Sequence, residues 1–278
     1  MSLLRIGHSP DADDAFMFYA FAKEKVTIDG YEIQQVLEDI QSLNERALQG
    51  ELEVTAISAG AYPILADSYR IMACGASIGR SYGPILLSTK HDDLSQLAGK
   101  RIAVPGEHTT AYLLLRIFMP VPFEAVIVDF DSVGEAVKSG DVDAGLIIHE
   151  GQLTWSSEGF NNLLDLGEEW GKSSGLPIPL GLDVLHRRLG DAAHEQITVS
   201  FRASVKYAID HEDEAIDYAL PFGRGIDADT CRRFVRMYVN QDTLHMGSEG
   251  KDALELLYRR AYDKGLISRL PPLDIIGL

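Results

Sequence analysis

The order of apolar runs and amphipathic stretches in the N-terminal part of the chain predicts alternating strands and helices. Short apolar runs typical of buried strands occupy 3–8, 31–37 and 53–57. Apolar residues recur at helical spacing in the ranges 13–25, 39–49 and 60–67. Repeated strand–helix–strand units favour a mostly parallel sheet with helices on both faces, which is the α/β class.

A polar stretch at 88–99 interrupts this pattern, and a second strand–helix series follows it. Its strands are expected at 101–104, 125–128 and 144–149, its helices at 110–119 and 132–139, and a last strand-like run at 180–188. Beyond Gly190 the pattern is almost wholly helical, over 193–210, 212–219, 229–239 and 247–265.

These two series predict two lobes with a cleft between them. The simplest division makes 1–89 and 190–278 one large lobe and 90–189 an inserted small lobe. Two crossing segments would then form a hinge that lets the lobes close on a ligand. A continuous two-domain arrangement is the alternative. The length of 278 residues, with 46% hydrophobic and 24% charged residues, suits a globular protein with two cores.

Charge and cysteine content narrow the range of partners. The formal net charge is −17, from 25 Lys and Arg against 42 Asp and Glu, and such a surface repels nucleic acid and anionic membranes. The two cysteines, Cys74 and Cys231, match no metal or redox spacing. The N-terminal residues do not resemble a secretory signal, and no apolar run is long enough to span a bilayer, so we expect a cytoplasmic protein.

Candidate site residues follow the predicted strands, because ligands of open parallel sheets bind beyond the carboxyl ends of the strands. After the first strand, Ser9 and Asp11 could face the cleft, although the acids of this SPDADD segment also suit capping of the next helix. The segment lacks the pattern of a calcium loop, so we expect no metal. After the third strand, Ser58 could bind a ligand or cap a short helix.

Two further segments carry donors that suit an anion. Thr109 and Thr110 begin a helix after a strand, where free backbone N–H groups and two hydroxyls favour an anion site over a simple cap. Arg80, in a turn, could pair with a ligand carboxylate or be a solvated turn arginine.

The strongest candidate for chemistry is His149, at the end of an apolar strand, where an imidazole can act as a general base near neutral pH. The competing interpretation is a structural histidine held by hydrogen bonds. We expect no nucleophile elbow of the serine-hydrolase type, and the chain lacks Walker, G-x-G-x-x-G, HExxH and CxxC motifs, so nucleotide cofactors, zinc and serine hydrolysis are not expected.

Six segments of the chain, taken in order and at this spacing, resemble one family. They are HSPDADDAFMFYA, LEDIQSLNERAL, SYGPILL, VPGEHTTAYLLL, DAGLIIHE and GLPIPLG. Together they resemble the 1,4-dihydroxy-6-naphthoate synthases of the futalosine route to menaquinone, over about 4–265. The resemblance implies a two-lobed, periplasmic-binding-protein-like type II fold without a signal peptide.

The resemblance also implies an activity. The family converts cyclic dehypoxanthine futalosine into 1,4-dihydroxy-6-naphthoate, a carbon–carbon lyase step that uses no metal or organic cofactor. The histidine of the IIHE segment, His149 here, would be the base, and Ser58, Thr109 and Thr110 would contact the ligand. The expected partner is the small-molecule substrate, cyclic dehypoxanthine futalosine. We expect no binding to nucleic acid or to a membrane, and we include a homodimer among the expected assemblies.

One segment departs from the family pattern, and two other functions are considered. Many members read SPCPND where this chain reads SPDADD, so Asp11, Ala12 and Asp13 replace Cys, Pro and Asn. The first alternative is the sister activity, chorismate dehydratase, whose family resembles an Ile-Gly-Asp pattern at the IIHE position. The second is a non-catalytic protein that binds a small anion. The histidine favours the synthase, and the missing signal counts against the binding protein.

Overall fold

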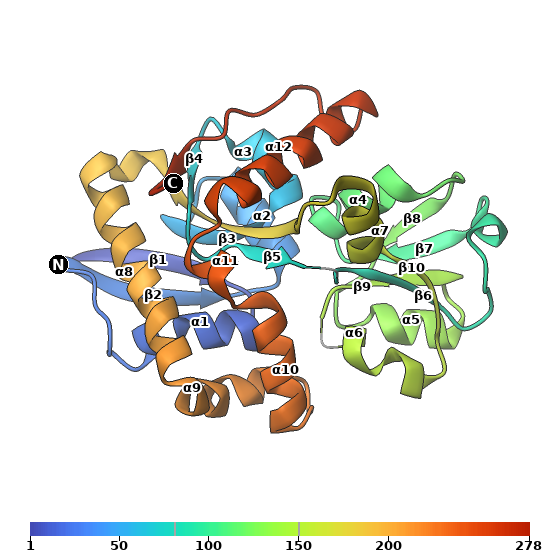
Figure 1. Cartoon of the computed structure of the whole chain (residues 1–278), viewed down its shortest axis with the longest axis horizontal. Coiled ribbons are helices and arrows are strands. Elements are labelled where there is room, and N and C mark those ends of the chain that lie inside the picture. Colours follow the sequence, from blue (N-terminus) through green and yellow to red (C-terminus); the bar gives the residue numbers. More distant parts are fainter. Residues whose placement is uncertain (81, 150) are drawn as a thin grey trace.

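The structure is a computed structural model that describes residues 1–80, 82–149 and 151–278, and it consists of two lobes (Figure 1). Each lobe is built around its own sheet. The larger sheet has the order β12-β4-β11-β3-β1-β2, with β5 paired to β11. Its strands are β1 (Ser2–His8), β2 (Tyr31–Leu37), β3 (Val54–Ser58), β4 (Tyr69–Met72), β5 (Ser77–Gly79), β11 (Ile178–His186) and β12 (Ile275–Ile276).

The second sheet has the order β10-β6-β9-β7-β8. Its strands are β6 (Ile85–Ser88), β7 (Arg101–Val104), β8 (Glu124–Ile127), β9 (Ala144–Ile147) and β10 (Asn161–Asp165). Both sheets are mixed. β1 and β7 pair with parallel neighbours, whereas β11 and β6 run antiparallel to their neighbours. The α/β class is therefore confirmed, with antiparallel strands where the chain enters and leaves the second sheet.

Helices cover both sheets (Figure 1). In the large lobe they are α1 (Ala12–Ala22), α2 (Ile40–Leu48), α3 (Tyr62–Leu65), α8 (Asp191–Asp210), α9 (Glu212–Ala219), α10 (Ala228–Tyr238), α11 (Gln241–Leu244) and α12 (Gly247–Asp263). In the small lobe they are α4 (Thr110–Phe118), α5 (Val133–Ser139), α6 (Gly151–Thr154) and α7 (Leu166–Ser174). Within the described ranges, no helix is both long and apolar enough to cross a membrane.

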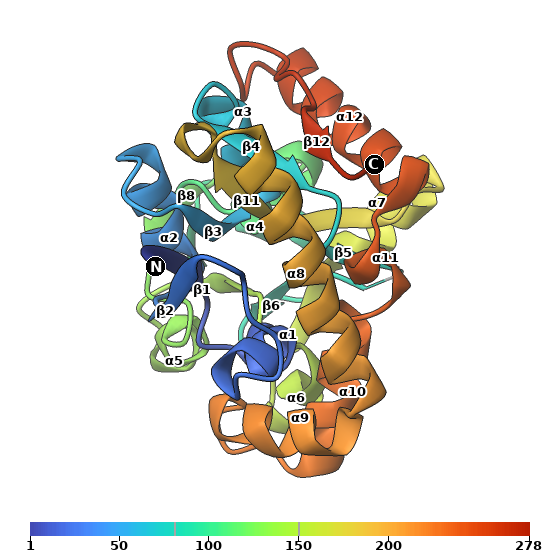
Figure 2. The ribbon, with the colours of Figure 1, turned by 90° about the vertical axis from the view of Figure 1, so that its left-hand side faces the viewer.

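The acidic residues that follow β1 are buried because they form the first turn of α1, which is enclosed by other helices. Its residues from Ala12 to Phe21 are all buried, because α8, α9 and α10 pack around it (Figure 2). A helix that is apolar on every side is stable only when enclosed in this way. Since its first turn is enclosed as well, Asp13 and Asp14 are only 8% and 9% exposed.

The sheets correct the expected division of the chain. Residues 180–188 were expected in the small lobe, but β11 lies between β3 and β4 of the large sheet. Residues up to 89 were expected in the large lobe, but β6 pairs with β9 and β10 of the second sheet. The second sheet and its helices therefore span β6 to α7, and the chain crosses between lobes before β6 and after α7. Strands of the large sheet lie on both sides of this segment in sequence.

Candidate active site

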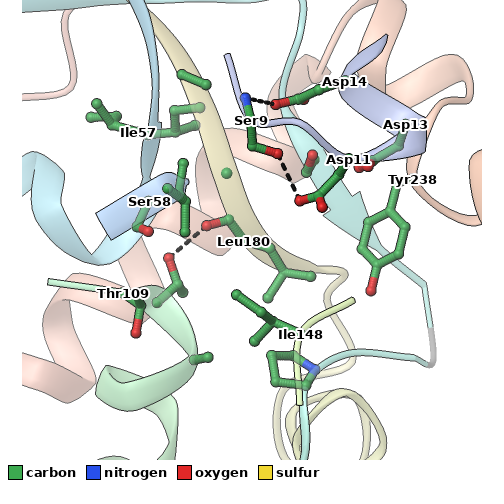
Figure 3. A pocket seen from close by; sticks show the side chains of 18 of the residues that line it. Ser9, Asp11, Asp13, Asp14, Ile57, Ser58, Thr109, Ile148, Leu180 and Tyr238 are labelled. Atoms are coloured by element: carbon green, nitrogen blue, oxygen red, sulfur yellow. Dashed lines mark hydrogen bonds between the residues drawn. The ribbon is translucent and has the colours of Figure 1, made fainter. Parts of the chain in front are cut away.

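A cavity lies between the lobes, and residues of both lobes line it. The large lobe contributes the loop after β1, the end of β3 and part of β11, and the small lobe contributes the start of α4 and residues beside α6. Figure 3 shows two polar groups facing each other across Leu180, with Ser58 and Thr109 on one side and Ser9 with three aspartates on the other.

The loop after β1 is held by its own carboxylates. The backbone N–H of Ser9 donates to Asp14 Oδ2 at 2.6 Å, and the Ser9 hydroxyl donates to Asp11 Oδ2 at 2.7 Å. Asp11 is the N-cap residue of α1, but its side chain makes no capping hydrogen bond. Burial raises the pKa of the Asp14 carboxyl above its ordinary value. The acids of this loop are therefore more than helix caps, and both Ser9 and Asp11 line the cavity as expected.

Ser58 ends β3 and is fixed by an asparagine that sequence reasoning missed. Asn44 of α2 is fully buried; its Oδ1 accepts from the Ser58 N–H at 2.8 Å and its Nδ2 donates to Ser58 Oγ at 3.1 Å. Because Ser58 Oγ accepts from Asn44, its own proton is directed elsewhere, and Ser58 lines the cavity. The available signal was a polar residue beside the apolar stripe of Leu43 and Ala47.

The two threonine hydroxyls of α4 are engaged with the protein. Thr109 Oγ1 donates to the carbonyl of Gly106 at 2.8 Å and accepts from the N–H of Tyr112 at 3.3 Å, which makes it an N-cap. Thr110 Oγ1 donates to the Leu180 carbonyl at 2.5 Å and accepts from the Gly60 N–H at 2.9 Å. Both threonines line the cavity, but their O–H groups are committed.

The anion donors at this end are therefore backbone groups. The first-turn N–H groups of a helix have no partner within the helix, and they carry the positive end of its dipole. The N–H of Tyr112 is taken by Thr109, which leaves those of Thr110 and Ala111 at the start of α4, beside the Ser58 hydroxyl. This end of the cavity suits a carboxylate.

Hydrogen bonds between the lobes surround the cavity. Besides the Thr110 contacts, the His108 N–H donates to Gln41 Oε1 at 3.1 Å, and the Tyr238 hydroxyl donates to Gln152 Oε1 at 2.9 Å. Gly60 allows the closest approach, since a side-chain carbon there would lie 3.1 Å from the Cα of Thr110. The lobes are thus in contact on more than one side of the site.

His149 lies beside the cavity rather than in its wall. Its neighbours Ile148 and Gln152 line the cavity, and the ring packs edge-on against Phe130 with centroids 6.1 Å apart. The Gly151 N–H donates to His149 Nδ1 at 3.0 Å, so a neutral ring in this arrangement carries its proton on Nε2. Glu150, which follows it in the IIHE segment, lies outside the described residues.

Arg224 links Asp11 to the histidine's surroundings. Its guanidinium pairs with Asp11 Oδ1 at 2.5 Å and lies over the Phe130 ring, 4.7 Å from the centroid. Burial lowers the pKa of His149 below its ordinary value, and the charge of Arg224 lowers it further, while Asp11 acts in the opposite direction. The imidazole is therefore neutral at pH 7, as a base requires.

This charge arrangement predicts opposite effects of two neutralising substitutions on the acid limb of the kcat/KM profile. Arg224→Gln removes a charge that lowers the pKa of His149, so the limb should move to higher pH. Asp11→Asn removes a charge that raises it, so the limb should move to lower pH. Both profiles are measured from pH 4 to 9. Shifts in the same direction would show that another group titrates.

Arg80 is not brought to the cavity. Its side chain is half-exposed, and its guanidinium pairs with Asp242 at 2.7 Å and with Glu249 at 2.6 Å. Both acids belong to the C-terminal helical part of the chain. The expectation that Arg80 meets a ligand carboxylate is not supported by this placement, because its charge is already matched by two acids.

Two lobes with separate mixed sheets, joined by two crossings with a cavity between them, define a periplasmic-binding-protein-like fold of type II. Solved structures agree at the level of fold. The alkanesulfonate-binding protein SsuA of Xanthomonas axonopodis, bound to MOPS, is 16% identical with a TM-score of 0.74, covering 99% of this chain and 98% of that one. A crystal structure from Archaeoglobus fulgidus is 46% identical with a TM-score of 0.91, covering 95% and 98%.

Sequence comparison then gives the family. Residues 4–263 match the menaquinone biosynthesis family, and the chain belongs to it. A protein of Thermus thermophilus called 1,4-dihydroxy-6-naphtoate synthase is 37% identical over 271 residues, covering 98% of both chains. A Streptomyces coelicolor protein of the same name is 35% identical over 274 residues, covering 97% of this chain and 96% of its own. The expected family is therefore confirmed.

Proposed function

We propose that this protein is a lyase that converts cyclic dehypoxanthine futalosine into 1,4-dihydroxy-6-naphthoate. The observation that carries the proposal is the cavity between the lobes, which pairs a carboxylate-binding end with a neutral histidine at its border. Two relatives with the synthase name, each more than one third identical over nearly the whole chain, support the same reaction. The chorismate dehydratase and the non-catalytic binding protein are not favoured by these relatives.

The α4 end of the cavity would hold the carboxylate of the substrate. The N–H groups of Thr110 and Ala111 and the hydroxyl of Ser58 supply the donors, and Asn44 fixes the serine. Thr109 and Thr110 act by shaping the helix start and by joining the lobes, rather than through their hydroxyl protons. Contacts between the lobes exclude water from the bound substrate.

His149 would act as the base that starts the carbon–carbon cleavage. The ring is neutral because burial and Arg224 lower its pKa, and the product gains an aromatic ring, which supplies driving force without a cofactor. In a ring protonated on Nε2, the lone pair is on Nδ1, which here accepts from Gly151. Proton transfer therefore requires that the substrate replace the Gly151 N–H at Nδ1.

The reaction is tested by giving the purified protein cyclic dehypoxanthine futalosine and chorismate in separate incubations, with product analysis by mass spectrometry. We expect 1,4-dihydroxy-6-naphthoate from the first and no dehydration in the second. Product from chorismate alone would replace the proposal with the dehydratase, and binding without turnover would favour the binding protein. We place the reaction in the cytoplasm, and the homodimer stays a prediction.

A further inference from the structure

Asp183 is a buried acid in the middle of the large sheet that the mechanism above does not use. It lies on β11 opposite Ala56 of β3, and its side chain is 2% exposed. Both residues line the cavity. A carboxyl group in the centre of a sheet is costly unless it is paired, so its presence at the cavity floor calls for a physical reason.

The carboxyl of Asp183 has little polar support from the protein. Among the described residues, Oδ1 has no hydrogen-bond partner. The other oxygen, Oδ2, lies against Gly75: a side-chain carbon built on Gly75 would lie 2.2 Å from Oδ2 and 2.8 Å from a ring carbon of Phe201. Gly75, with a φ of +87°, thus makes room for the acid without supplying it a donor. An ionised carboxylate would be left without compensation here.

The charged groups around Asp183 also favour its neutral form. Burial raises the pKa of Asp183 well above its ordinary value, and the negative charge of Asp14 on α1 raises it further. Asp14 is in turn influenced by His8 of β1, while the buried thiol of Cys74 interacts with Asp183 and with Arg202 of α8. A protonated carboxyl carries one O–H donor, and Asp183 lines the cavity.

The cavity is polar at both ends but of opposite character. The start of α4 and Ser58 favour a negative group at one end, whereas Asp11, Asp13 and Asp14 crowd the other, as Figure 3 shows. A second anionic group of a ligand would be repelled from the aspartate end. The part of the ligand that lies there is therefore not an anion, and a neutral hydrogen-bonding group such as a hydroxyl or carbonyl, which the proposed product carries, fits this end.

We propose that Asp183 is a substrate-binding residue that, as a neutral acid, donates a hydrogen bond to a hydroxyl or carbonyl oxygen on the end of the ligand away from its carboxylate. The inference rests on the proposed function for the identity of that ligand. It explains why the sheet retains an acid whose Oδ1 finds no hydrogen-bond partner in the described part of the chain, since the ligand completes its hydrogen bonding. The competing account is a permanently trapped water.

The protonation of Asp183 is tested without any ligand by infrared spectroscopy. At pH 7 the wild-type protein should show a carboxylic acid C=O stretch that is missing from Asp183→Asn. Asp14→Asn serves as the matched control, because it removes the neighbouring buried acid and should leave the Asp183 band in place. Adding 1,4-dihydroxy-6-naphthoate should shift the band to lower frequency. A wild-type spectrum without this band overturns the inference.

Binding measurements identify the atom that Asp183 recognises. By calorimetry, Asp183→Ala should weaken binding of 1,4-dihydroxy-6-naphthoate by about 5- to 100-fold, and Asp183→Asn, which retains N–H donors, should weaken it less. The comparison ligand is 2-naphthoate, which has the carboxylate but neither hydroxyl, and it should bind all three proteins alike. Equal losses for both ligands would mean that Asp183 only shapes the cavity, and equal affinities of all proteins would favour the trapped water.

The outcome separates this inference from the proposed function. If the wild-type protein makes 1,4-dihydroxy-6-naphthoate while both Asp183 variants bind it as tightly as wild type, only the inference fails. If the wild-type protein makes no product but the ligand-specific loss is seen, only the proposed reaction fails. Absence of both turnover and naphthoate binding overturns both. Thermal melting followed by circular dichroism checks that each variant is folded. If Asp183→Ala unfolds, the test is made with Asp183→Asn alone.

Discussion

Replacing His149 by Ala is expected to lower kcat/KM for cyclic dehypoxanthine futalosine by about 10²–10⁴-fold, the usual cost of losing a general base. The effect should fall on chemistry rather than on binding, because the proposed carboxylate donors are the N–H groups of α4 and the hydroxyl of Ser58 rather than the imidazole. Single-turnover kinetics with excess enzyme measure the chemical step directly. Unaltered turnover would remove the base assignment.

A matched variant separates proton transfer from the structural contact of the ring. In His149→Asn, the amide oxygen takes a place close to that of Nδ1 and can still accept from the Gly151 N–H, which lies 3.0 Å from Nδ1 in the native structure. The amide cannot accept a proton at neutral pH. We expect this variant to melt like the wild type and to be as inactive as the Ala variant. Substantial activity in the Asn variant would assign His149 to loop support.

Gly167→Ala is expected to lower the free energy of unfolding by about 3 kcal/mol or more, which is a large effect for one methyl group. A side-chain carbon at Gly167 would lie 2.1 Å from the carbonyl carbon of Tyr82 and 2.4 Å from the backbone nitrogen of Gly83. These are backbone atoms of the segment that crosses into the small lobe, so they cannot turn aside as a side chain would. Either α7 or the crossing segment has to move.

The same helix supplies the control for that prediction. A side-chain carbon at Gly171 of α7 would meet no atom within 4 Å, and its φ lies outside the left-handed region. Gly171→Ala should therefore raise stability by about 0.5–1 kcal/mol through its better helix propensity. Urea unfolding followed by circular dichroism measures both variants. Equal stability of the Gly167 variant and the wild type would mean that the crossing segment is not tightly packed on α7.

The sequence predicted best those features that depend on local pattern. The strands around Ile6, Val54 and Ala103 are apolar runs, and the structure has strands at each. The run at 180–188 is also a strand, but its partners, β3 and β4, are far away in sequence. Strand pairing depends on such long-range contacts, which periodicity does not record, so the lobe boundaries were misplaced.

The site residues likewise divide into those that local sequence pattern locates and those that depend on long-range contacts. Ser9, Asp11, Ser58, Thr109 and Thr110 follow strands, and the rule for carboxyl ends of strands located all of them at the cavity. Arg80 met the same rule, yet its partners Asp242 and Glu249 come from distant helices that no local pattern connects to it.

Residues inside regular elements were harder to find. Asn44 lies within a helix and Asp183 within a strand, so neither follows the end of a strand. Their signal was a polar residue among apolar neighbours, as in the segment GLDVL. That signal indicates burial, but only coordinates show what the residue faces.

The central position of β11 determines the order in which the two sheets can be completed during translation. The ribosome releases β1, β3 and β4 first, and β11, which lies between β3 and β4, appears only after the small lobe has been synthesised. The large sheet must therefore wait with a gap between two of its strands, exposing unpaired strand edges that favour association with other chains. The segment from β6 to α7 contains every strand of its own sheet and can be completed earlier. During translation, then, the lobe that starts later is the first to have all its strands, and the N-terminal half has to wait until β11, which follows that lobe, has been synthesised.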